Sequence, residues 1–251
     1  MTSRVLVDPA ELREDRVRVE GDRAHHLRRV SRVRDGERVV LFVGEGRERD
    51  AEVLRADARG VVLVASSEPR DGVRRDAARV TWLQGVPKGD KLDAIARQAT
   101  ELGVERIVPV WTRRSVPVER SDRVGARHER LRRVVEEAAR QCGRADIPAV
   151  DPPCDLATAL AAASRCALRL VAWERASRPL EALPDPAGGG VAVLAGPEGG
   201  ISDEEARQAE ALGWVCVSLG PRILRAETVA PALLAVLSAR WGDLRGGAGQ
   251  G

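Results

Sequence analysis

From residue 79 onward the sequence alternates short apolar runs with amphipathic stretches, and this alternation restricts the fold more than any other feature. The apolar runs have the length and composition of buried strands and lie at residues 80–83, 106–110, 168–173, 191–195 and 215–219. The stretches between several of them carry apolar residues every three or four positions, as helices do, at 90–103, 131–142, from 202 and at about 228–241. Strands that alternate with helices form a mostly parallel sheet with helices on both faces. We therefore expect an α/β domain over residues 79–245.

Several of these helices carry capping signals at their ends. Asp90 precedes the first helix as an N-cap, and Gly103 and Gly143 follow the last apolar positions of two others. Ser202 with Glu205 three residues later has the spacing of a capping box. These signals place the expected helix boundaries independently of the apolar pattern.

The first 66 residues follow a different pattern of short β-rich runs broken by glycines. The runs lie at residues 4–7, 17–19, 37–43, 51–54 and 61–65, with a short amphipathic helix beginning near Asp22. This pattern predicts a small β-barrel domain over residues 1–70. The polar segment 71–78, which contains Gly72, has the composition of a linker, and the glycine-rich end at 246–251 that of a disordered tail.

Composition excludes several classes of protein. No apolar run approaches the roughly 20 residues that span a bilayer, and the first ten residues lack the layout of a signal peptide, so we expect a soluble, cytoplasmic protein with no membrane partner. The four cysteines form no CxxC pair, and the three histidines supply no metal-ligand spacing with them. We therefore expect neither a disulfide scaffold nor a metal site.

Charge is unevenly distributed along the chain. Residues 106–144 hold 11 arginines against 5 acidic residues, whereas residues 145–251 hold 9 arginines against 13. A basic segment of this kind suits a phosphate backbone, although a solvated helix face is the commoner explanation. The charge pattern leaves both interpretations open.

Two glycine-containing loops follow predicted strands directly. Residues 196–200 read GPEGG after the run 191–195, and residues 220–228 read GPRILRAET after the run 215–219. Neither is a Walker phosphate loop or a GxGxxG dinucleotide turn. Ligands of open parallel sheets bind beyond the carboxyl ends of the strands, so the pair favours a ligand site over two independent tight turns.

These and other strings resemble the RsmE family of 16S rRNA uridine-N3 methyltransferases. The resemblance is carried by PKGDKLDAIARQATELGVERIVPV at 87–110, RRSV at 113–116, EEAARQCGR at 136–144, LAGPEGGISDEE at 194–205 and LGPRILRAETVAPALL at 219–234. It begins at HHLRRV, residues 25–30, and thus covers nearly the whole chain. It implies a PUA-like RNA-binding barrel at residues 1–70 and a SPOUT methyltransferase domain with a carboxy-terminal trefoil knot at residues 79–245. It further implies S-adenosyl-L-methionine as cofactor, a homodimer, and 16S rRNA, within the small ribosomal subunit, as partner.

The resemblance also implies which residues form the site. The cofactor-binding set is Leu194, Gly196, Pro197, Glu198, Gly199, Gly200, Leu219, Gly220, Ile223, Leu224, Arg225 and Thr228. The RNA-binding set is His25, Arg28, Arg29, Arg113, Arg114 and Arg144. Loss of the N3 proton of a uridine, which methyl transfer to N3 requires, puts negative charge on the base carbonyls, and Arg225 is the nearest candidate cation for this catalytic role. A helix-entry salt bridge from Arg225 to Glu227 or Glu198 is an equal alternative, and the sequence identifies no general base.

Two other functions are compatible with parts of the sequence. Another SPOUT enzyme acting on tRNA or on a ribose 2′-hydroxyl is disfavoured, because the stretch QATELGVER lacks the Asn and Arg motif that ribose-methylating relatives usually carry. A non-catalytic ribosome-assembly factor is disfavoured because a protein that only binds RNA has no need for the paired loops. The expected activity is therefore rRNA base methylation.

Overall fold

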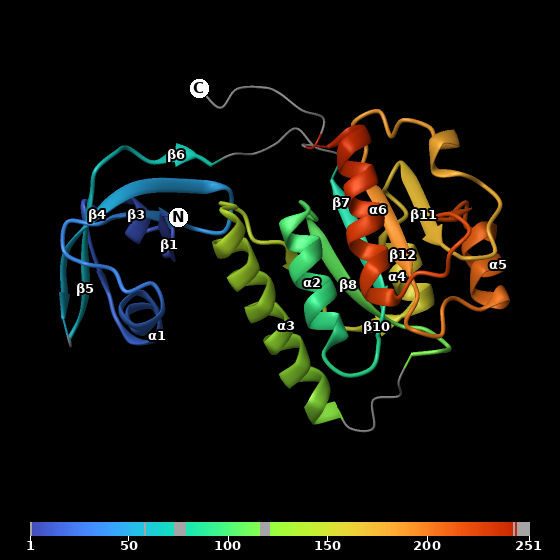
Figure 1. Cartoon of the computed structure of the whole chain (residues 1–251), viewed down its shortest axis with the longest axis horizontal. Helices are drawn as coiled ribbons and strands as arrows, with labels where there is room; N and C mark the ends of the chain where they lie inside the picture. Colours follow the sequence, from blue (N-terminus) through green and yellow to red (C-terminus); the bar gives the residue numbers. More distant parts are fainter. Residues whose placement is uncertain (1, 58, 73–78, 116–120, 243, 245–251) are drawn as a thin grey trace. The chain divides into compact units, whose positions relative to one another are not determined.

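The computed structural model describes residues 2–57, 59–72, 79–115, 121–242 and 244, and the chain divides into two compact units (Figure 1). The first unit comprises Met1–Arg74 and Ala139–Ile147, and the second comprises Arg75–Ala138 and Pro148–Gly251. Of the predicted linker, Asp71 pairs with Arg47 of β4 (Arg47–Asp57) and the amide of Gly72 donates to the carbonyl of Gly46, whereas residues 73–78 lie outside the described residues. The predicted tail at 246–251 also lies outside them.

The first unit is built on a six-stranded, mainly antiparallel sheet in the order β1-β3-β4-β5-β2, with β6 on β4. The strands are β1 (Ser3–Leu6), β2 (Arg16–Val19), β3 (Arg38–Phe42), β4 (Arg47–Asp57), β5 (Gly60–Ala65) and β6 (Arg70–Asp71). A 3₁₀ turn, η1 (Glu11–Arg13), and a short helix α1 (Gly21–His25) that continues as the π-helical turn η2 (His26–Val30) complete the unit. Each predicted β-rich run is confirmed as a strand. The helix predicted near Asp22 is also confirmed.

Residues 139–147 belong to this first unit although they lie far along the chain. The amide of Gly46 donates to the carbonyl of Ala145 at 3.1 Å, and the amide of Ile147 donates to that of Gly44 at 2.8 Å. Arg4 donates to the carbonyl of Arg144 at 3.2 Å. The sequence-based division placed this segment in the second domain, because pairing between such distant segments leaves no periodic signal.

The second unit holds a seven-stranded sheet in which every ladder is parallel, so the predicted α/β class is confirmed. The order is β10-β8-β7-β12-β11-β13, with β9 beside β8. The strands are β7 (Val80–Gly85), β8 (Arg106–Trp111), β9 (Ala149–Val150), β10 (Cys154–Asp155), β11 (Leu168–Ala172), β12 (Val191–Ala195) and β13 (Val215–Val217). The two shortest, β9 and β10, were not predicted, because two residues are too few to show a period.

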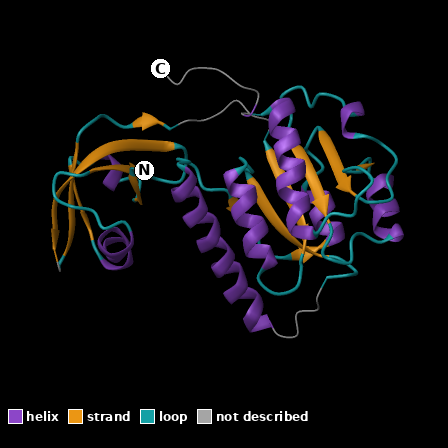
Figure 2. Cartoon of the chain, viewed as in Figure 1, coloured by secondary structure: helices purple, strands orange, loops and turns teal. Residues whose placement is uncertain are grey.

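Helices cover both faces of this sheet, as predicted (Figure 2). They are α2 (Lys91–Glu101), α3 (Ser121–Cys142), α4 (Leu156–Ala162), α5 (Asp203–Ala211) and α6 (Ala226–Trp241), with a 3₁₀ turn η3 (Leu180–Ala182). One face packs into a core with α4 and α5, while α2 and α6 pack together and α6 contacts β12. The sequence did not predict α4, since its alanine-rich stretch has little polar face.

The capping signals have mixed outcomes. The capping box at Ser202 and Glu205 is confirmed. Asp90 occupies the predicted N-cap of α2, but its side chain makes no capping bond and instead pairs with Arg130 at 3.1 Å. Gly103 and Gly143 follow their helices at φ +86° and +84°, which favours glycine.

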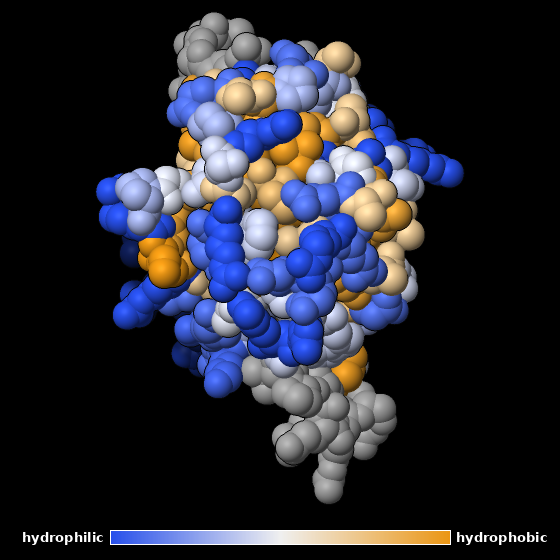
Figure 3. Space-filling view, turned by 90° about the vertical axis from the view of Figure 1, so that its right-hand side faces the viewer, coloured by the Kyte–Doolittle hydropathy of each residue, from blue (hydrophilic) through white to orange (hydrophobic). Residues whose placement is uncertain are grey.

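All four cysteines are free. Among the described residues no group of His, Cys, Asp and Glu could hold a metal ion. No helix in the same part of the chain is long and apolar enough to cross a membrane. The face seen from the α5 side carries mainly hydrophilic side chains around a smaller apolar area (Figure 3).

Candidate functional site

The two glycine-containing loops meet at one edge of the second unit's sheet and line a single cavity. The cavity measures about 520 Å³ and lies beyond the carboxyl ends of β11, β12 and β13, where parallel sheets bind ligands. This volume falls within the roughly 300–1,000 Å³ of small-molecule and cofactor sites. The structure therefore brings both loops to one ligand-sized space.

Most of the predicted cofactor residues line this cavity. They are Gly196, Pro197, Glu198, Gly199, Gly200, Leu219, Gly220, Ile223, Leu224 and Arg225. Leu194 is instead fully buried in the core of β12, and Thr228 lies exposed on the first turn of α6 without lining the cavity. Sequence reasoning missed other residues that do line it, among them Lys91, Trp173, Glu174 and Glu227.

The loop at 196–200 is a closed turn that tolerates no side chain at its first residue. A Cβ at Gly196 would lie 2.6 Å from the carbonyl carbon of Gly200, and Gly200 itself adopts φ +74°. The amide of Gly200 donates to the carbonyl of Pro197 at 2.9 Å. Gly196 is therefore required by the turn itself, whereas at Gly220 a Cβ would meet nothing within 4 Å.

A fully buried glutamine holds this turn on the central strand. Gln84, on β7, donates from Nε2 to the carbonyl of Gly196 at 3.0 Å and to that of Gly85 at 3.0 Å. Its Oε1 accepts from Nε1 of Trp82 at 2.9 Å. Because every polar atom of Gln84 is bonded, its side chain fixes the start of the loop. A polar residue inside an apolar strand run was the sequence signal for this role.

One ammonium group links the two loops to α2. Lys91 Nζ lies 2.9 Å from Glu198 Oε1, in the first loop, and 3.7 Å from Glu227 Oε2, at the end of the second. Glu198 also accepts from the amide of Lys88 at 3.2 Å. Burial works to raise the pKa of Glu198, but the hydrogen bond from Lys91 and those from the backbone outweigh it, so this pKa lies below its usual 4.5. Glu198 is thus a charged anchor of its own loop.

Arg225 presents its guanidinium to solvent at the rim of the cavity. Its side chain is 85% exposed, and Nη1 lies 4.0 Å from Glu227 Oε1. Its backbone caps α6, because the carbonyl accepts from the amide of Thr228 at 2.8 Å. The predicted alternative of a salt bridge to Glu227 is therefore present only at the limit of an ion pair, which leaves the guanidinium accessible to a ligand.

The predicted RNA-binding residues fall into two groups in different units. In the first unit, His25 and Arg29 are exposed on α1 and η2, with Arg28 half-buried between them. In the second unit, Arg114 donates to the carbonyl of Gly199, and Arg113 pairs with Glu204 at 3.0 Å.

Arg144 belongs to the first unit, whereas Arg113 and Arg114 belong to the second. It pairs with Asp146 at 2.5 Å, and its side chain is only 16% exposed. A phosphate would have to displace this carboxylate.

The charged side chains around the cavity are of both signs and suit a small ligand that carries both charges. Three carboxylates, those of Glu174, Glu198 and Glu227, line it together with Lys91, Arg222 and Arg225. Glu227 Oε2 is buried and lacks a hydrogen-bond partner among the described residues, since Lys91 is too distant to donate. A buried acceptor oxygen without a partner is available to accept a hydrogen bond from a ligand.

Two family models match the chain. A model of the RNA methyltransferase domain matches residues 74–238, and a model of the RNA methyltransferase PUA domain matches residues 19–66. The ribosomal RNA small subunit methyltransferase E of Mycobacterium tuberculosis is 34% identical, over 89% of this chain and 87% of that protein. The protein of the same name from Bacillus subtilis is 29% identical over 91% of each chain.

Solved structures give the same result. The ribosomal RNA small subunit methyltransferase E of Neisseria gonorrhoeae, bound to S-adenosyl methionine, superposes with a TM-score of 0.87 at 28% identity and covers 96% of this chain and 99% of its own. A protein of Legionella pneumophila, in complex with the bound cofactor SAM, superposes with a TM-score of 0.88 at 29% identity over 97% of this chain and 99% of its own.

Proposed function

Since the chain belongs to the ribosomal RNA small subunit methyltransferase E family, an S-adenosylmethionine-dependent family of rRNA methyltransferases, we propose that it methylates N3 of one uridine in 16S rRNA. The observation that carries the proposal is the cavity where the two glycine-containing loops meet. Its size, its side chains of both charges and its glycine backbone suit a cofactor that carries a sulfonium, an ammonium and a carboxylate group. Relatives with this fold were solved with that cofactor bound.

S-adenosylmethionine supplies an electrophilic methyl group when bound. The chain's own residues have to hold it, align the acceptor base and assist loss of the N3 proton. Gly196–Gly200 and Leu219–Arg225 form the walls that hold it, and Glu227 offers an acceptor to its polar end. Arg225 stabilises the negative charge that spreads over the two carbonyls of the deprotonated uracil.

The retained cavity favours catalysis over simple RNA binding. A protein that only binds RNA has no use for loops held by Gln84 and Lys91 around a ligand-sized space. Base methylation is favoured over ribose methylation because the first strand-helix unit reads QATELGVER, without the Asn and Arg motif of the ribose-methylating relatives.

Two basic surfaces bind the rRNA in this proposal. His25, Arg28 and Arg29 lie on one short helical segment of the first unit, within the residues that match the PUA domain model. Arg113 and Arg114 flank the cofactor loop in the second unit. Loss of Arg144 should weaken RNA binding least, because that side chain is already paired with Asp146. Salt titration of each alanine variant tests this order, and a flatter slope for Arg144→Ala than for Arg29→Ala contradicts it.

The proposed enzyme is a homodimer with a carboxy-terminal trefoil knot. Residues 229–237 of helix α6 are all apolar, and Ala232 and Val236 are only half-buried within one chain, as on a helix that packs against a further partner. Sedimentation of Val236→Glu against the wild type tests the dimer, and an unchanged mass contradicts this interface. An experimental trace of residues 191–241 tests the knot, which an unthreaded path would exclude.

The cofactor site is tested by one glycine variant and a matched control. Gly220→Val places a side chain at the cavity wall, and Gly103→Val imposes the same left-handed strain, at φ +86° and in open space, on a turn that does not line the cavity. Calorimetry should show loss of S-adenosylmethionine binding in the first variant only. Equal affinity in both variants would exclude the assigned cavity.

A further inference from the structure

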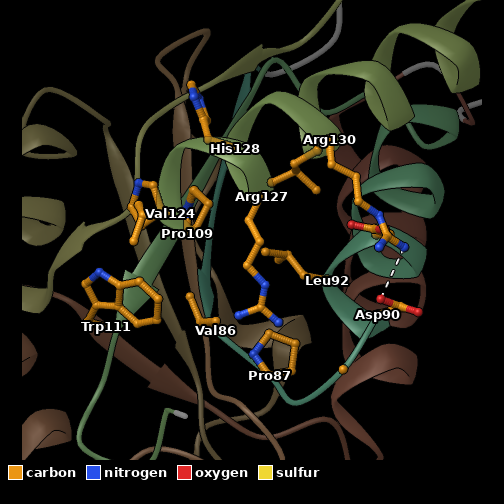
Figure 4. Close-up of a pocket in the computed structure, with 14 residues that line it drawn as sticks. Val86, Pro87, Asp90, Leu92, Pro109, Trp111, Val124, Arg127, His128 and Arg130 are labelled. Atoms are coloured by element: carbon orange, nitrogen blue, oxygen red, sulfur yellow. Dashed lines mark ion pairs between the residues drawn. The ribbon is translucent and has the colours of Figure 1, made fainter. Parts of the chain in front are cut away.

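A second, smaller cavity lies along the same edge of the same sheet. It measures about 50 Å³ and opens beyond the carboxyl ends of β7 and β8, beside the first turns of α2 and one face of α3. Its walls are mainly apolar and are formed by Val86, Pro87, Leu92 and Pro109 (Figure 4). A buried water needs roughly 10–15 Å³ by this measure of volume, so the cavity holds about four waters. That volume is about the volume of one six-membered ring and far smaller than the volume of a cofactor.

The aromatic residues of the chain single out this cavity. The chain has one Phe, no Tyr and five Trp. Phe42, Trp82, Trp214 and Trp241 are buried in the cores. The two aromatic residues that remain partly exposed each line one cavity at this sheet edge. Trp173 lines the larger cavity and Trp111 lines the smaller one. A partly exposed indole in a small apolar cavity offers a stacking surface for a flat ring. The smaller cavity is called the slot below.

A cationic side chain, that of Arg127, lies at the mouth of the slot. Figure 4 shows the Arg127 side chain running from α3 toward Val86 and Pro87. Its neighbour Arg130 is held by Asp90 at 3.1 Å and by Asp93 at 2.7 Å. Arg127 has no ion pair with any carboxylate among the described residues, and its side chain is exposed at the mouth. Its guanidinium is therefore available to a carbonyl or a phosphate.

The topology sets the slot beside the cofactor cavity. In the sheet order, β7 pairs with β12, so the loop after β7 is the neighbour of the loop that begins at Gly196. Four residues of that loop line the slot, namely Val86, Pro87, Gly89 and Asp90, and Lys91, immediately after, lines the cofactor cavity. The amide of Lys88 donates to Glu198 across the boundary. An acceptor held in the slot thus lies next to the methyl donor's site.

We propose that this slot binds the acceptor pyrimidine of the RNA, turned out of its stack, with its ring against Trp111 and a carbonyl or its phosphate on Arg127. The inference rests on the proposed function and adds the place of the acceptor base. Enzymes that modify a base inside structured RNA or DNA extrude it into a pocket and stack it on aromatic or apolar side chains. The volume of the slot matches a single six-membered ring.

Kinetics on the full-length protein test the slot. Trp111→Ala and Arg127→Ala should each raise the KM for rRNA, by roughly 5- to 150-fold for the tryptophan, as loss of base stacking does. S-adenosylmethionine affinity should stay unchanged, and Trp111→Phe should recover most of the loss. Arg132→Ala is the matched control, because Arg132 lies on the same helix and pairs with Glu129 away from the slot.

A photo-crosslink locates the base directly. RNA with 4-thiouridine at the methylated position, irradiated in the complex, should attach to residues 86–93, 109–115 or 124–131. The slot is excluded as the base site by any of three results: attachment elsewhere, attachment only from a flanking nucleotide, or a wild-type KM in both alanine variants. In each of these cases, methyl transfer by the wild type leaves the proposed function standing. A wild-type protein that binds the cofactor but methylates no RNA overturns both.

Discussion

At the scale of single residues, the site combines groups that the sequence made conspicuous with groups that it did not. The glycines of both loops and Arg225 stand out because strand-following glycine turns suggest backbone contact with a ligand. Lys91 does not stand out, since its role depends on partners more than a hundred residues away, and Gln84 is marked only as a polar residue in an apolar strand. Leu194 shows the converse: it belongs to a conspicuous string, yet its side chain is buried in the core.

Arg225 carries the residue-scale prediction. Arg225→Lys keeps the positive charge but loses the planar, fixed guanidinium, so turnover should fall on the order of a hundredfold while the affinities for cofactor and rRNA change little. Single-turnover rates with saturating rRNA and cofactor measure this effect. Arg207→Lys, an exposed arginine on α5 outside the cavity, is the control. A wild-type rate in Arg225→Lys would make Arg225 a structural cap of α6.

At the scale of elements, most strands and helices followed from periodicity, but α4 and the first half of α3 did not. The runs that became β8, β11 and β12 match their predictions within one residue, and β7 extends two residues beyond its predicted run. The structure differs at β13, which ends at Val217, because the chain turns early into the second loop. It differs also at α6, which begins at Ala226, since Arg225 caps it through its backbone. Local signals locate elements, whereas their exact ends depend on the site that they carry.

The link between α2 and the two loops gives the element-scale prediction. Lys91→Met should weaken S-adenosylmethionine binding about tenfold or more, because it frees Glu198 and Glu227 from their common partner. Lys88→Met is a matched control, since only the backbone amide of Lys88 contacts Glu198. Calorimetry of both variants checks the result, and equal affinities would show that the loops hold their spacing without Lys91.

The pH dependence of this link follows from the two pKa values. The pKa of Glu198 is lowered, so its contribution is present above 4.5 and is lost as the pH falls through its folded value. The pKa of Lys91 is raised, chiefly by its hydrogen bond to Glu198, so its contribution is present below 10.5 and is lost as the pH rises further. The effect of Lys91→Met should therefore be constant between these limits.

At the scale of the whole molecule, the sequence indicated two domains but not their true composition. The polar stretch after residue 70 marks one crossing of the chain between the units. The chain crosses between the units twice more, at the two ends of residues 139–147. Nothing in the composition of these residues separates them from the helix before or the strand after. Their place is set by hydrogen bonds to Gly44 and Gly46, which no local pattern encodes.

Ala145 carries the whole-molecule prediction. It is 3% exposed, and its Cβ would lie 2.2 Å from a Cβ added at Gly72, so the contact is tight. Ala145→Leu should destabilise the first unit by about 1–3 kcal/mol through overpacking. Hydrogen exchange in β3 and β4 should rise while cofactor affinity stays unchanged. Ala149→Leu, at an exposed position of β9, is the control, and unchanged protection in Ala145→Leu would mean that the segment is not part of that core.

The identity of the methylated atom tests the central claim most directly. Small ribosomal subunits whose 16S rRNA lacks the modification would be incubated with the protein and S-adenosylmethionine, and the rRNA digested to nucleosides for mass spectrometry. The account predicts one 3-methyluridine per 16S rRNA molecule and no methylated ribose. A methyl group on a ribose hydroxyl or on another base, or none on 16S rRNA while tRNA is modified, would contradict it.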